Sequence, residues 1–459
     1  MNSFEVIPIE ENLINTLKKD LLKRNKELVR FYELLLAQEG VSSIAIDGRW
    51  GSGKTFFVKQ SMLLVNARNP VSNMDKDKRA SIVCALPFQR QIEETENYNI
   101  AVYYDAWEND NDTDPVLSLV YEIIRQLGIN YTFEDNGNVF KLAGAILEAL
   151  TSRNISGIIE NLKGPNPLTK IKEEKDLHEN IENFFTELLA ERANRLVIFI
   201  DELDRCKPSY AVQLLERIKH YLHDERITFV FSVNLGELQH TIKHYYGNTF
   251  DACRYLDRFF DMRISLPPAD KTAFYSEMGL ESGYVLEKIC QKVINTYNME
   301  LREATRFYRQ VKTAAYEPTH QSKKFDFVFS EGKGKRLLLM YIVPVLVGLK
   351  IVDISLYNEF ICGRSSKPLM DMYKDSDTGE RLAAVLLNRD ETLENGDGKN
   401  IVTVEQKLQQ LYDAVFVTEY TGRVYNTILG ECEFDDSSKQ FVMKVESMLS
   451  VYADYSSIR

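Results

Sequence analysis

The stretch from Gly48 to Thr55 reads Gly-Arg-Trp-Gly-Ser-Gly-Lys-Thr, and it decides how the surrounding chain must fold. It follows a β-rich run at residues 41–46 and precedes a helical pattern at residues 56–64. This order, with the spacing G-x-x-x-x-G-K-[ST], is the context of a phosphate-binding loop. Its glycines let backbone N–H groups face phosphate oxygens, and the next helix adds a favourable dipole. A bound nucleoside triphosphate is therefore predicted, against the alternative of an ordinary glycine-rich turn.

Two side chains of this loop have predicted chemical roles. Lys54 is expected to reach the β- and γ-phosphates, and Thr55 is expected to place its hydroxyl on Mg²⁺. The residues expected to bind the nucleotide within the loop are Gly48, Trp50, Gly51, Ser52, Gly53, Lys54 and Thr55.

Asp201 and Glu202 supply the predicted second half of the site. They directly follow residues 196–200, a continuously apolar run typical of a strand buried in a parallel sheet. A carboxylate at such a strand end can bind Mg²⁺, which we assign to Asp201, and hydrolysis needs a group that deprotonates water, which we assign to Glu202. The alternative is a surface Asp-Glu turn. The glutamate favours hydrolysis over phosphoryl transfer to a metabolite.

Strand-like and helical segments alternate through the first part of the chain, which predicts an α/β fold with a doubly wound parallel sheet. Ligands of such sheets bind at the carboxyl ends of the strands. After Pro268 the sequence predicts helices instead. The predicted strands are residues 41–46, the short segment 81–86, and residues 99–105, 196–200, 227–233 and 262–266.

The composition limits the classes of function. A net charge of −12 and a pI of about 5.3 argue against broad coating of nucleic acid or anionic membrane. The six cysteines are widely spaced without a C-x-x-C pair, so neither a disulfide framework nor a zinc site is expected. A cytoplasmic location fits this usage, and the N-terminus lacks the features of a signal peptide.

Residues 337–349 form an apolar run that tests the expectation of no transmembrane segment. A bilayer span needs about 17 to 25 residues, and this run is shorter. A buried helix is therefore predicted.

Three sequence features together resemble the KAP-type P-loop NTPases. They are the loop in the form G-R-W-G-S-G-K-T, the passage Y-Y-D-A-W-E-N-D at residues 103–110, and I-D-E-L-D-R-C-K-P at residues 200–208. The resemblance covers roughly residues 25–350. It implies an ATP-hydrolysing core related to the AAA+ and STAND groups, with another strand between the catalytic strand and the first. Many members insert transmembrane helices between the nucleotide motifs, but residues 128–175 contain no apolar span of about 17 residues.

The resemblance suggests further site residues, each with an open alternative. Asn234 is placed like a polar sensor residue that contacts the attacked phosphate, or it caps the next helix. Arg258, with Arg254, lies where related enzymes keep an arginine finger for a neighbouring subunit, or these arginines pair with Asp257 and Asp261. Trp50 and Trp107 are expected to pack around the loop.

Arg302 resembles the sensor arginine of the family's helical lid. It shares one predicted helical face with Arg306, Arg309 and Lys312. A solvated basic face is the alternative, and nucleic-acid contact is a third option with weak aromatic support.

These features predict four parts of the chain. They are an N-terminal helical segment (1–40, one helix over 10–38), the P-loop NTPase core (41–268, with a helical insert at about 128–190), a helical lid (269–364) and a helical C-terminal region (365–459).

The expected function is a molecular switch that binds ATP and hydrolyses it with Mg²⁺. The resemblance implies bacterial anti-phage defence or signalling, with a homo-oligomer or a protein of the same system as partner. We find no N-K-x-D motif, so ATP is preferred to GTP. Two alternatives remain open: a nucleic-acid-dependent ATPase, which the acidic balance disfavours, and a non-catalytic ATP-binding scaffold.

Overall fold

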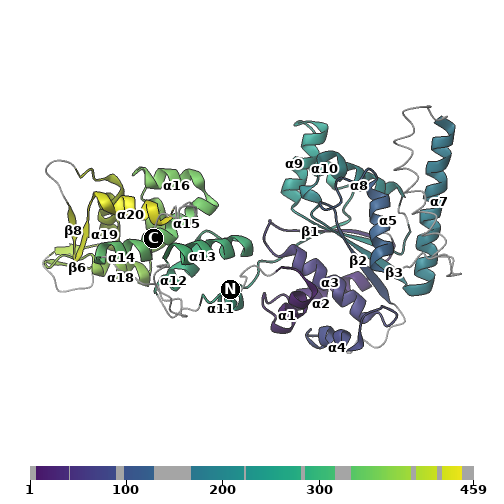
Figure 1. Cartoon of the computed structure of the whole chain (residues 1–459), viewed down its shortest axis with the longest axis horizontal. Helices are drawn as coiled ribbons and strands as arrows, with labels where there is room; N and C mark the ends of the chain where they lie inside the picture. The colour runs from purple at the N-terminus through teal and green to yellow at the C-terminus, as the bar shows by residue number, and fades with distance from the viewer. Residues whose placement is uncertain are drawn as a thin grey trace, which may run out of the picture. The chain divides into compact units, whose positions relative to one another are not determined.

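A computed structural model describes residues 7–40, 42–88, 98–128, 167–221, 224–280, 285–315, 332–393, 400–420 and 426–446. The chain forms two compact units that divide after Asp270, and each is described by itself (Figure 1). Most of the helical insert predicted near residues 128–190 lies outside the described residues.

The N-terminal unit is built on a parallel sheet of five strands in the order β2-β3-β4-β1-β5 (Figure 1). The predicted α/β fold is confirmed. Strand β4 separates β3 from β1, as the family resemblance implies. The strands are β1 (Ser42–Asp47), β2 (Asn99–Asp105), β3 (Arg195–Asp201), β4 (Ile227–Val233) and β5 (Met262–Ser265).

The strands alternate their side chains between two hydrophobic clusters, one on each face of the sheet. In β3, Val197 and Phe199 belong to the cluster on one face, and Ile198 and Ile200 belong to the cluster on the other. Both faces are buried, which explains the continuously apolar sequence of this strand.

Four helices cover the face that carries Val197 and Phe199 (Figure 1). They are α1 (Glu10–Lys19), α2 (Asn25–Leu36), α3 (Lys54–Arg68) and α4 (Lys76–Cys84). The prediction of one helix over residues 10–38 is wrong, because Asp20 (φ 45°) and Lys23 (φ 54°) have left-handed backbone conformations that break it.

The strand predicted at residues 81–86 is also wrong, because the first part of this segment completes α4. The Asp75 carboxylate caps that helix by accepting the N–H groups of Asp77 and Lys78. Ile82 then lies buried in the cluster beneath α1 and α3. A short apolar run is compatible with either structure, and here the cap selects the helix.

The opposite face is covered by helices that contribute to the second cluster. Helix α5 begins with Pro115 after Asp114, whose carboxylate accepts the N–H groups of Val116 and Leu117. The helices of this layer are α5 (Pro115–Gln126), α7 (Pro167–Arg192), α8 (Pro208–Tyr221), α9 (Leu235–Tyr246) and α10 (Ala252–Leu256).

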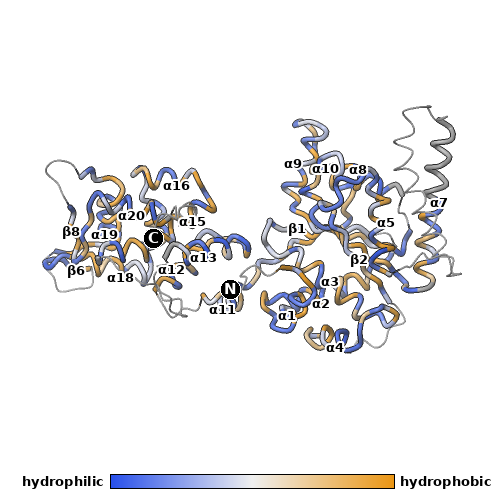
Figure 2. Tube along the Cα trace, viewed as in Figure 1, coloured by the Kyte–Doolittle hydropathy of each residue, from blue (hydrophilic) through white to orange (hydrophobic). Residues whose placement is uncertain are grey.

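The C-terminal unit is mostly helical, as predicted. Figure 2 shows hydrophobic and hydrophilic residues alternating along helices of both units, as expected where one side of a helix is buried. The helices are α11 (Thr272–Glu277), α12 (Val285–Thr296), α13 (Leu301–Ala315), α14 (Lys333–Leu337), the π-helix η2 (Leu338–Ile342), α15 (Val343–Val352), α16 (Ile354–Ile361), α17 (Lys367–Tyr373), α18 (Asp377–Val385), α19 (Val404–Tyr412), the π-helix η3 (Asp413–Val417) and α20 (Asp436–Glu446).

Two small sheets, which the sequence did not predict, complete this unit. Strands β6 (Glu391–Leu393) and β7 (Asn400–Val402) pair in parallel, and β8 (Thr427–Leu429) and β9 (Cys432–Phe434) pair antiparallel.

The apolar run at residues 337–349 is buried in the core of this unit. Leu338, Ile342 and Leu346 are each 0% exposed. The predicted buried helix is confirmed, although its first part is a π-helix. None of the described helices combines the length and apolar character that crossing a bilayer requires.

Candidate functional site

The phosphate loop connects β1 to α3 at the carboxyl edge of the sheet. The loop begins at Gly48, whose N–H donates to the Val233 carbonyl of β4 at 3.2 Å. Gly51 (φ 83°) and Gly53 (φ 90°) adopt conformations that favour glycine. A Cβ atom at Gly48 would approach Ser52 Oγ to 3.0 Å, so a side chain there would crowd the inside of the loop.

Lys54 and Ser52 present buried polar atoms within this loop. Lys54 is 8% exposed, and its Nζ donates to the carbonyls of Gly48 (2.6 Å) and Arg49 (3.2 Å). Burial lowers the pKa of Lys54, while the charges of Asp204 and Asp201 act to raise it. Ser52 Oγ is buried without a hydrogen-bond partner among the described residues. An oxygen-rich anion would satisfy both groups.

Arg24 stabilises the phosphate loop through a hydrogen bond to its main chain. Its guanidinium donates through Nη1 to the Ser52 carbonyl at 2.8 Å and through Nη2 to the Pro267 carbonyl at 2.5 Å. Arg24 is only 5% exposed and lies just before α2. The turn that breaks the predicted N-terminal helix therefore places this arginine under the phosphate loop.

Asp201 ends β3 beside the loop and is 1% exposed. Its Oδ1 accepts the Glu202 N–H at 3.0 Å, and its Oδ2 accepts the Tyr103 hydroxyl at 3.1 Å. Its charge acts on Lys54, as does that of Glu202. The fold thus brings Lys54, which follows β1, to the same edge of the sheet as Asp201 and Glu202, which follow β3 about 150 residues later in the sequence.

Glu202 has an unusual backbone and a perturbed carboxyl group. Its φ of 60° is left-handed, a conformation that is uncommon outside glycine and concentrates at functional sites. Its Oε2 lies 2.5 Å from Arg205 Nε. Burial and the neighbouring Asp201 raise the pKa of Glu202 to about 7, although Arg205 acts to lower it. Such a carboxyl group suits proton transfer near neutral pH.

Two tryptophans, Trp50 and Trp107, flank Arg205, the residue that pairs with the Glu202 carboxylate. Trp50 Nε1 donates to Asp204 Oδ2 at 2.5 Å, which connects the phosphate loop to the segment after β3. The Arg205 guanidinium carbon lies 5.6 Å from the ring centroids of both Trp50 and Trp107. Burial raises the pKa of Asp204, and the Trp50 hydrogen bond opposes this effect. Trp50 and Trp107 are 44% and 53% exposed and contact Asp204 and Arg205, so their packing around the loop stays a prediction.

Asn234 lies after β4, at the same edge of the sheet. Its Oδ1 accepts the Glu237 N–H at 3.4 Å and caps α9, so the capping alternative is present. Its backbone acts to lower the pKa of Asp204, in opposition to the effect of burial. The sensor role of its side chain stays a prediction.

Arg254 and Arg258 are exposed in and after α10. The carboxylates proposed as their surface partners have other bonds: Asp257 pairs with Arg263, and Asp261 accepts the Ser43 N–H at 2.9 Å. A role for Arg258 in a neighbouring subunit stays a prediction.

Arg302 lies on α13 in the C-terminal unit, so its relation to the phosphate loop stays a prediction. It is exposed together with Arg306 and Arg309. Lys312 differs, because its ammonium group lies 5.4 Å from the Tyr308 ring centroid.

Sequence reasoning missed two residues at this edge, Tyr103 and Ser232. Both lie on strands that pair with β3. Tyr103 is on β2, and Ser232 is on β4 directly across from Asp201. Ser232 Oγ is buried without a hydrogen-bond partner among the described residues. A serine near the end of a mostly apolar strand was the available signal for Ser232, whereas Tyr103 required knowledge of which strands are neighbours.

The donor set fits a magnesium ion that arrives with a nucleotide. Among the described residues, no group of three or more His, Cys, Asp or Glu side chains could hold a metal alone. Magnesium is usually bound by one or two protein oxygens together with phosphate oxygens and water. Thr55 and Asp201 could provide those protein oxygens.

Comparisons with known proteins agree with this geometry. Residues 24–318 match the model of the KAP family P-loop domain, a range that contains the phosphate loop, all five strands of the parallel sheet and α13. A search of curated proteins finds no match. Since the matched range covers more than half of the chain and a P-loop domain binds nucleotides, the chain belongs to the KAP family of nucleotide-binding P-loop NTPases.

Proposed function

We propose that this protein binds ATP and hydrolyses it in a magnesium-dependent reaction. The observation that carries the proposal is that the phosphate loop with Lys54 and the Asp201–Glu202 pair lie at the same edge of the sheet, where Trp50 of the loop donates to Asp204 at 2.5 Å. A phosphate loop alone would explain binding. A partly buried carboxyl group with a pKa of about 7, one residue after the proposed magnesium ligand, adds a base for water.

Each residue has a distinct role in this proposal. The N–H groups of the loop and the Lys54 ammonium bind the phosphates and meet the negative charge that moves during transfer. Thr55 and Asp201 would hold the magnesium ion, which would supply positive charge against the phosphates. Glu202 orients a water molecule and accepts its proton. Asn234, Arg258 and Arg302 are proposed to contact the nucleotide or its γ-phosphate.

The biological role follows by analogy with the family and not from the site. We propose a switch in bacterial anti-phage defence or signalling, in which the nucleotide state changes the arrangement of the C-terminal unit. The proposed location is the cytoplasm, and the proposed partner is a second copy or another protein of the same system.

The test is to measure ATP binding and phosphate release by the full chain, with Mg²⁺ and with EDTA. The Glu202→Gln variant is expected to retain ATP binding and to lose about 100-fold in hydrolysis, because an amide cannot accept the proton. GTP serves as the control nucleotide. A wild-type protein that binds ATP without hydrolysing it would be a scaffold, and Glu202→Gln would then leave its function intact.

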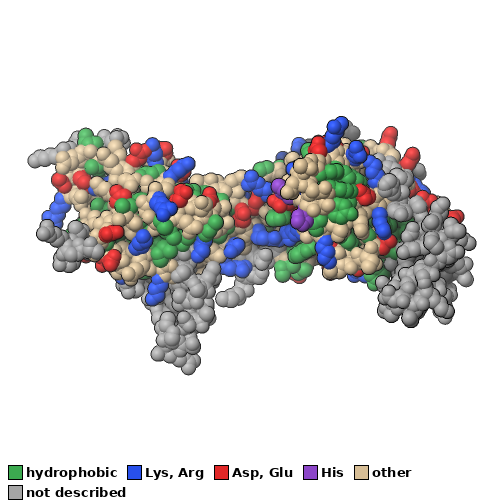
Figure 3. All heavy atoms as spheres, turned by 90° about the horizontal axis from the view of Figure 1, so that it is seen from above, with side chains coloured by type: hydrophobic (Ala, Val, Ile, Leu, Met, Phe, Trp, Pro, Cys, Tyr) green, Lys and Arg blue, Asp and Glu red, His purple; other side chains and the backbone are tan. Residues whose placement is uncertain are grey.

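A nucleic-acid-dependent ATPase remains the second candidate. Figure 3 shows basic and acidic side chains interspersed on the described part of one face, without a continuous basic surface there. Together with the net charge of −12, this argues against nucleic acid as a partner. Stimulation of hydrolysis by DNA or RNA, with a steep dependence on salt, would restore that candidate.

A further inference from the structure

We propose that Tyr103 is a positioning residue for the Asp201 carboxylate, setting the orientation in which this group meets the magnesium ion of a bound nucleotide. This inference rests on the proposed function, because it concerns the same metal. Its basis is that both oxygens of Asp201 accept hydrogen bonds from fixed donors, the Glu202 N–H and the Tyr103 hydroxyl.

The two hydrogen bonds fix the plane of a carboxylate that would otherwise rotate. The terminal torsion of an aspartate is broad and roughly two-fold, so the backbone alone does not determine where its oxygens point. Asp201 is 1% exposed, which leaves little access for bulk water. The tyrosine hydroxyl therefore provides the side-chain constraint on Oδ2, and the remaining lone pairs stay available to a metal.

Strand register explains why a tyrosine can reach this carboxylate. On the adjacent parallel strands β2 and β3, Asp105 is aligned with Asp201 and Tyr103 with Phe199. Tyr103 thus lies two residues before Asp201 along the sheet, a rise of about 6.6 Å. The phenol group spans this separation, and its hydroxyl ends 3.1 Å from Oδ2. A phenylalanine would fill the same space without a donor.

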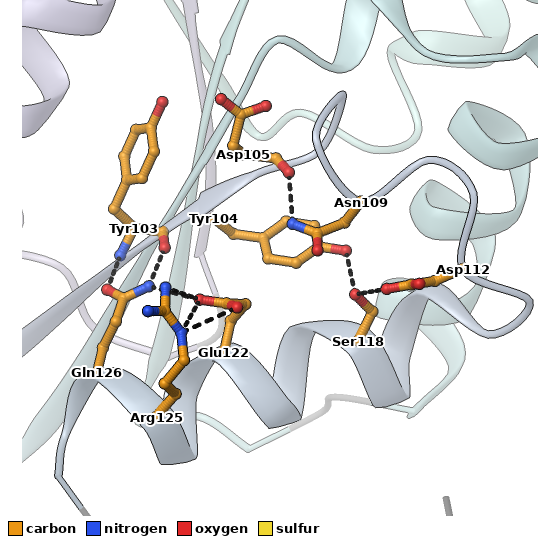
Figure 4. A network of polar contacts seen from close by, with 9 residues as sticks. All are labelled: Tyr103, Tyr104, Asp105, Asn109, Asp112, Ser118, Glu122, Arg125 and Gln126. Atoms are coloured by element: carbon orange, nitrogen blue, oxygen red, sulfur yellow. Dashed lines mark hydrogen bonds and ion pairs between the residues drawn. The ribbon is translucent and has the colours of Figure 1, made fainter.

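Tyr103 is itself held on both its main chain and its ring. Strand β2 is at the edge of the sheet. The Gln126 side chain closes that edge by accepting the Tyr103 N–H at 2.9 Å and donating to its carbonyl (Figure 4). The Lys59 ammonium lies 4.4 Å from the Tyr103 ring centroid. These contacts fix the donor before any nucleotide arrives.

Tyr104 provides a matched control on the same strand. Its hydroxyl donates to Ser118 Oγ at 3.0 Å and lies 2.5 Å from the hydroxyl of Tyr210. Figure 4 shows the two neighbouring tyrosines projecting to different sides of β2. Tyr104 belongs to the hydrophobic cluster under α5 and α8, away from the face that carries Asp201. Tyr104→Phe therefore removes a hydroxyl without touching the Asp201 carboxylate.

The experiment measures the affinity of the full chain for the non-hydrolysable analogue AMP-PNP, first in EDTA and then with excess Mg²⁺. In EDTA, Tyr103→Phe is expected to bind AMP-PNP like the wild type. Its increase in affinity on addition of Mg²⁺ is expected to be about 10-fold smaller than that of the wild type. Tyr104→Phe is expected to keep the full gain. Thermal unfolding of both variants verifies that they are folded.

Two results would overturn the role of Tyr103. One is a Tyr103→Phe protein with the full magnesium gain, and the other is equal loss of affinity with and without Mg²⁺, which would indicate a merely structural effect. A wild-type protein that fails to bind AMP-PNP is a different outcome, because it would refute the proposed function itself.

Discussion

Two buried lysines, Lys54 in the N-terminal unit and Lys407 in the C-terminal unit, are surrounded in opposite ways. Lys407 is 0% exposed, and its ammonium lies 2.5 Å from Glu391 Oε2 and donates to Gln410 at 3.0 Å. Lys54 instead donates to two backbone carbonyls of its own loop. The charge of Lys407 is neutralised by a carboxylate inside the fold. The ammonium of Lys54 has only carbonyls as hydrogen-bond partners among the described residues, and its charge stays available to an anion.

The largest expected effect concerns Lys54, since Lys54→Ala removes the cation that binds the phosphates. ATP hydrolysis is expected to fall by at least about 1,000-fold, which corresponds to ~4 kcal/mol. The free energy of unfolding is expected to change by less than about 1 kcal/mol. The ammonium is poorly hydrated in the folded protein, so its removal relieves a cost that offsets the lost contacts. Phosphate release and urea unfolding measure the two effects, with the exposed Lys76→Ala as control. A large loss of stability would show that Lys54 resembles Lys407 after all.

The next effect concerns the Lys407 pair and is expected in stability alone. Glu391→Leu leaves a fully buried ammonium without its carboxylate, so the free energy of unfolding is expected to fall by about 3 kcal/mol. The double variant Glu391→Leu/Lys407→Met is expected to recover most of that loss, because an apolar pair replaces an ion pair at little net cost. Urea unfolding of the three proteins gives the comparison. Equal destabilisation of the single and double variants would contradict it.

A smaller effect is expected when the site loses one hydrogen bond but keeps its aromatic ring. Trp50→Phe removes the N–H that Asp204 accepts, so hydrolysis is expected to fall about 5-fold, or ~1 kcal/mol. Trp107→Phe keeps a ring beside Arg205 and is expected to stay within about 2-fold of the wild type, since most of the cation–π contact remains. Steady-state ATPase rates measure both. Equal losses would assign the role of Trp50 to its ring and not to its N–H.

The smallest effect is a pH dependence of the Lys407 pair. Burial raises the pKa of Glu391, but hydrogen bonds from Lys407 and the Asn388 N–H outweigh this and lower it below its ordinary value of 4.5. A lowered pKa in the folded state stabilises the fold above the ordinary pKa, and this stabilisation is lost as the pH falls through the lowered value. The stability of the wild type relative to the double variant is therefore expected to decrease below about pH 4.5. A constant difference down to pH 3, measured by urea unfolding, would argue against the pair.

The sequence predicted those parts of the fold and the site that depend on local patterns. Residues 48–55 identify their loop by spacing, and residues 196–200 identify a doubly buried strand by composition. Tyr103 could not be found in this way, because its partner Asp201 is 98 residues away and becomes a neighbour only through the pairing of β2 with β3. The helix α4 was missed for a related reason: Asp75 caps it from outside the apolar segment that suggested a strand.

Arg24 has a consequence for the kinetics of ligand capture. Its guanidinium connects the Ser52 carbonyl of the phosphate loop to the Pro267 carbonyl near the end of the N-terminal unit. A loop held in this way loses its conformational freedom during folding. The entropic cost of ordering the loop therefore does not reduce its affinity when a ligand binds later. The loop is thus a preorganised receptor, for which association with a nucleotide is expected to be fast and limited by diffusion and orientation.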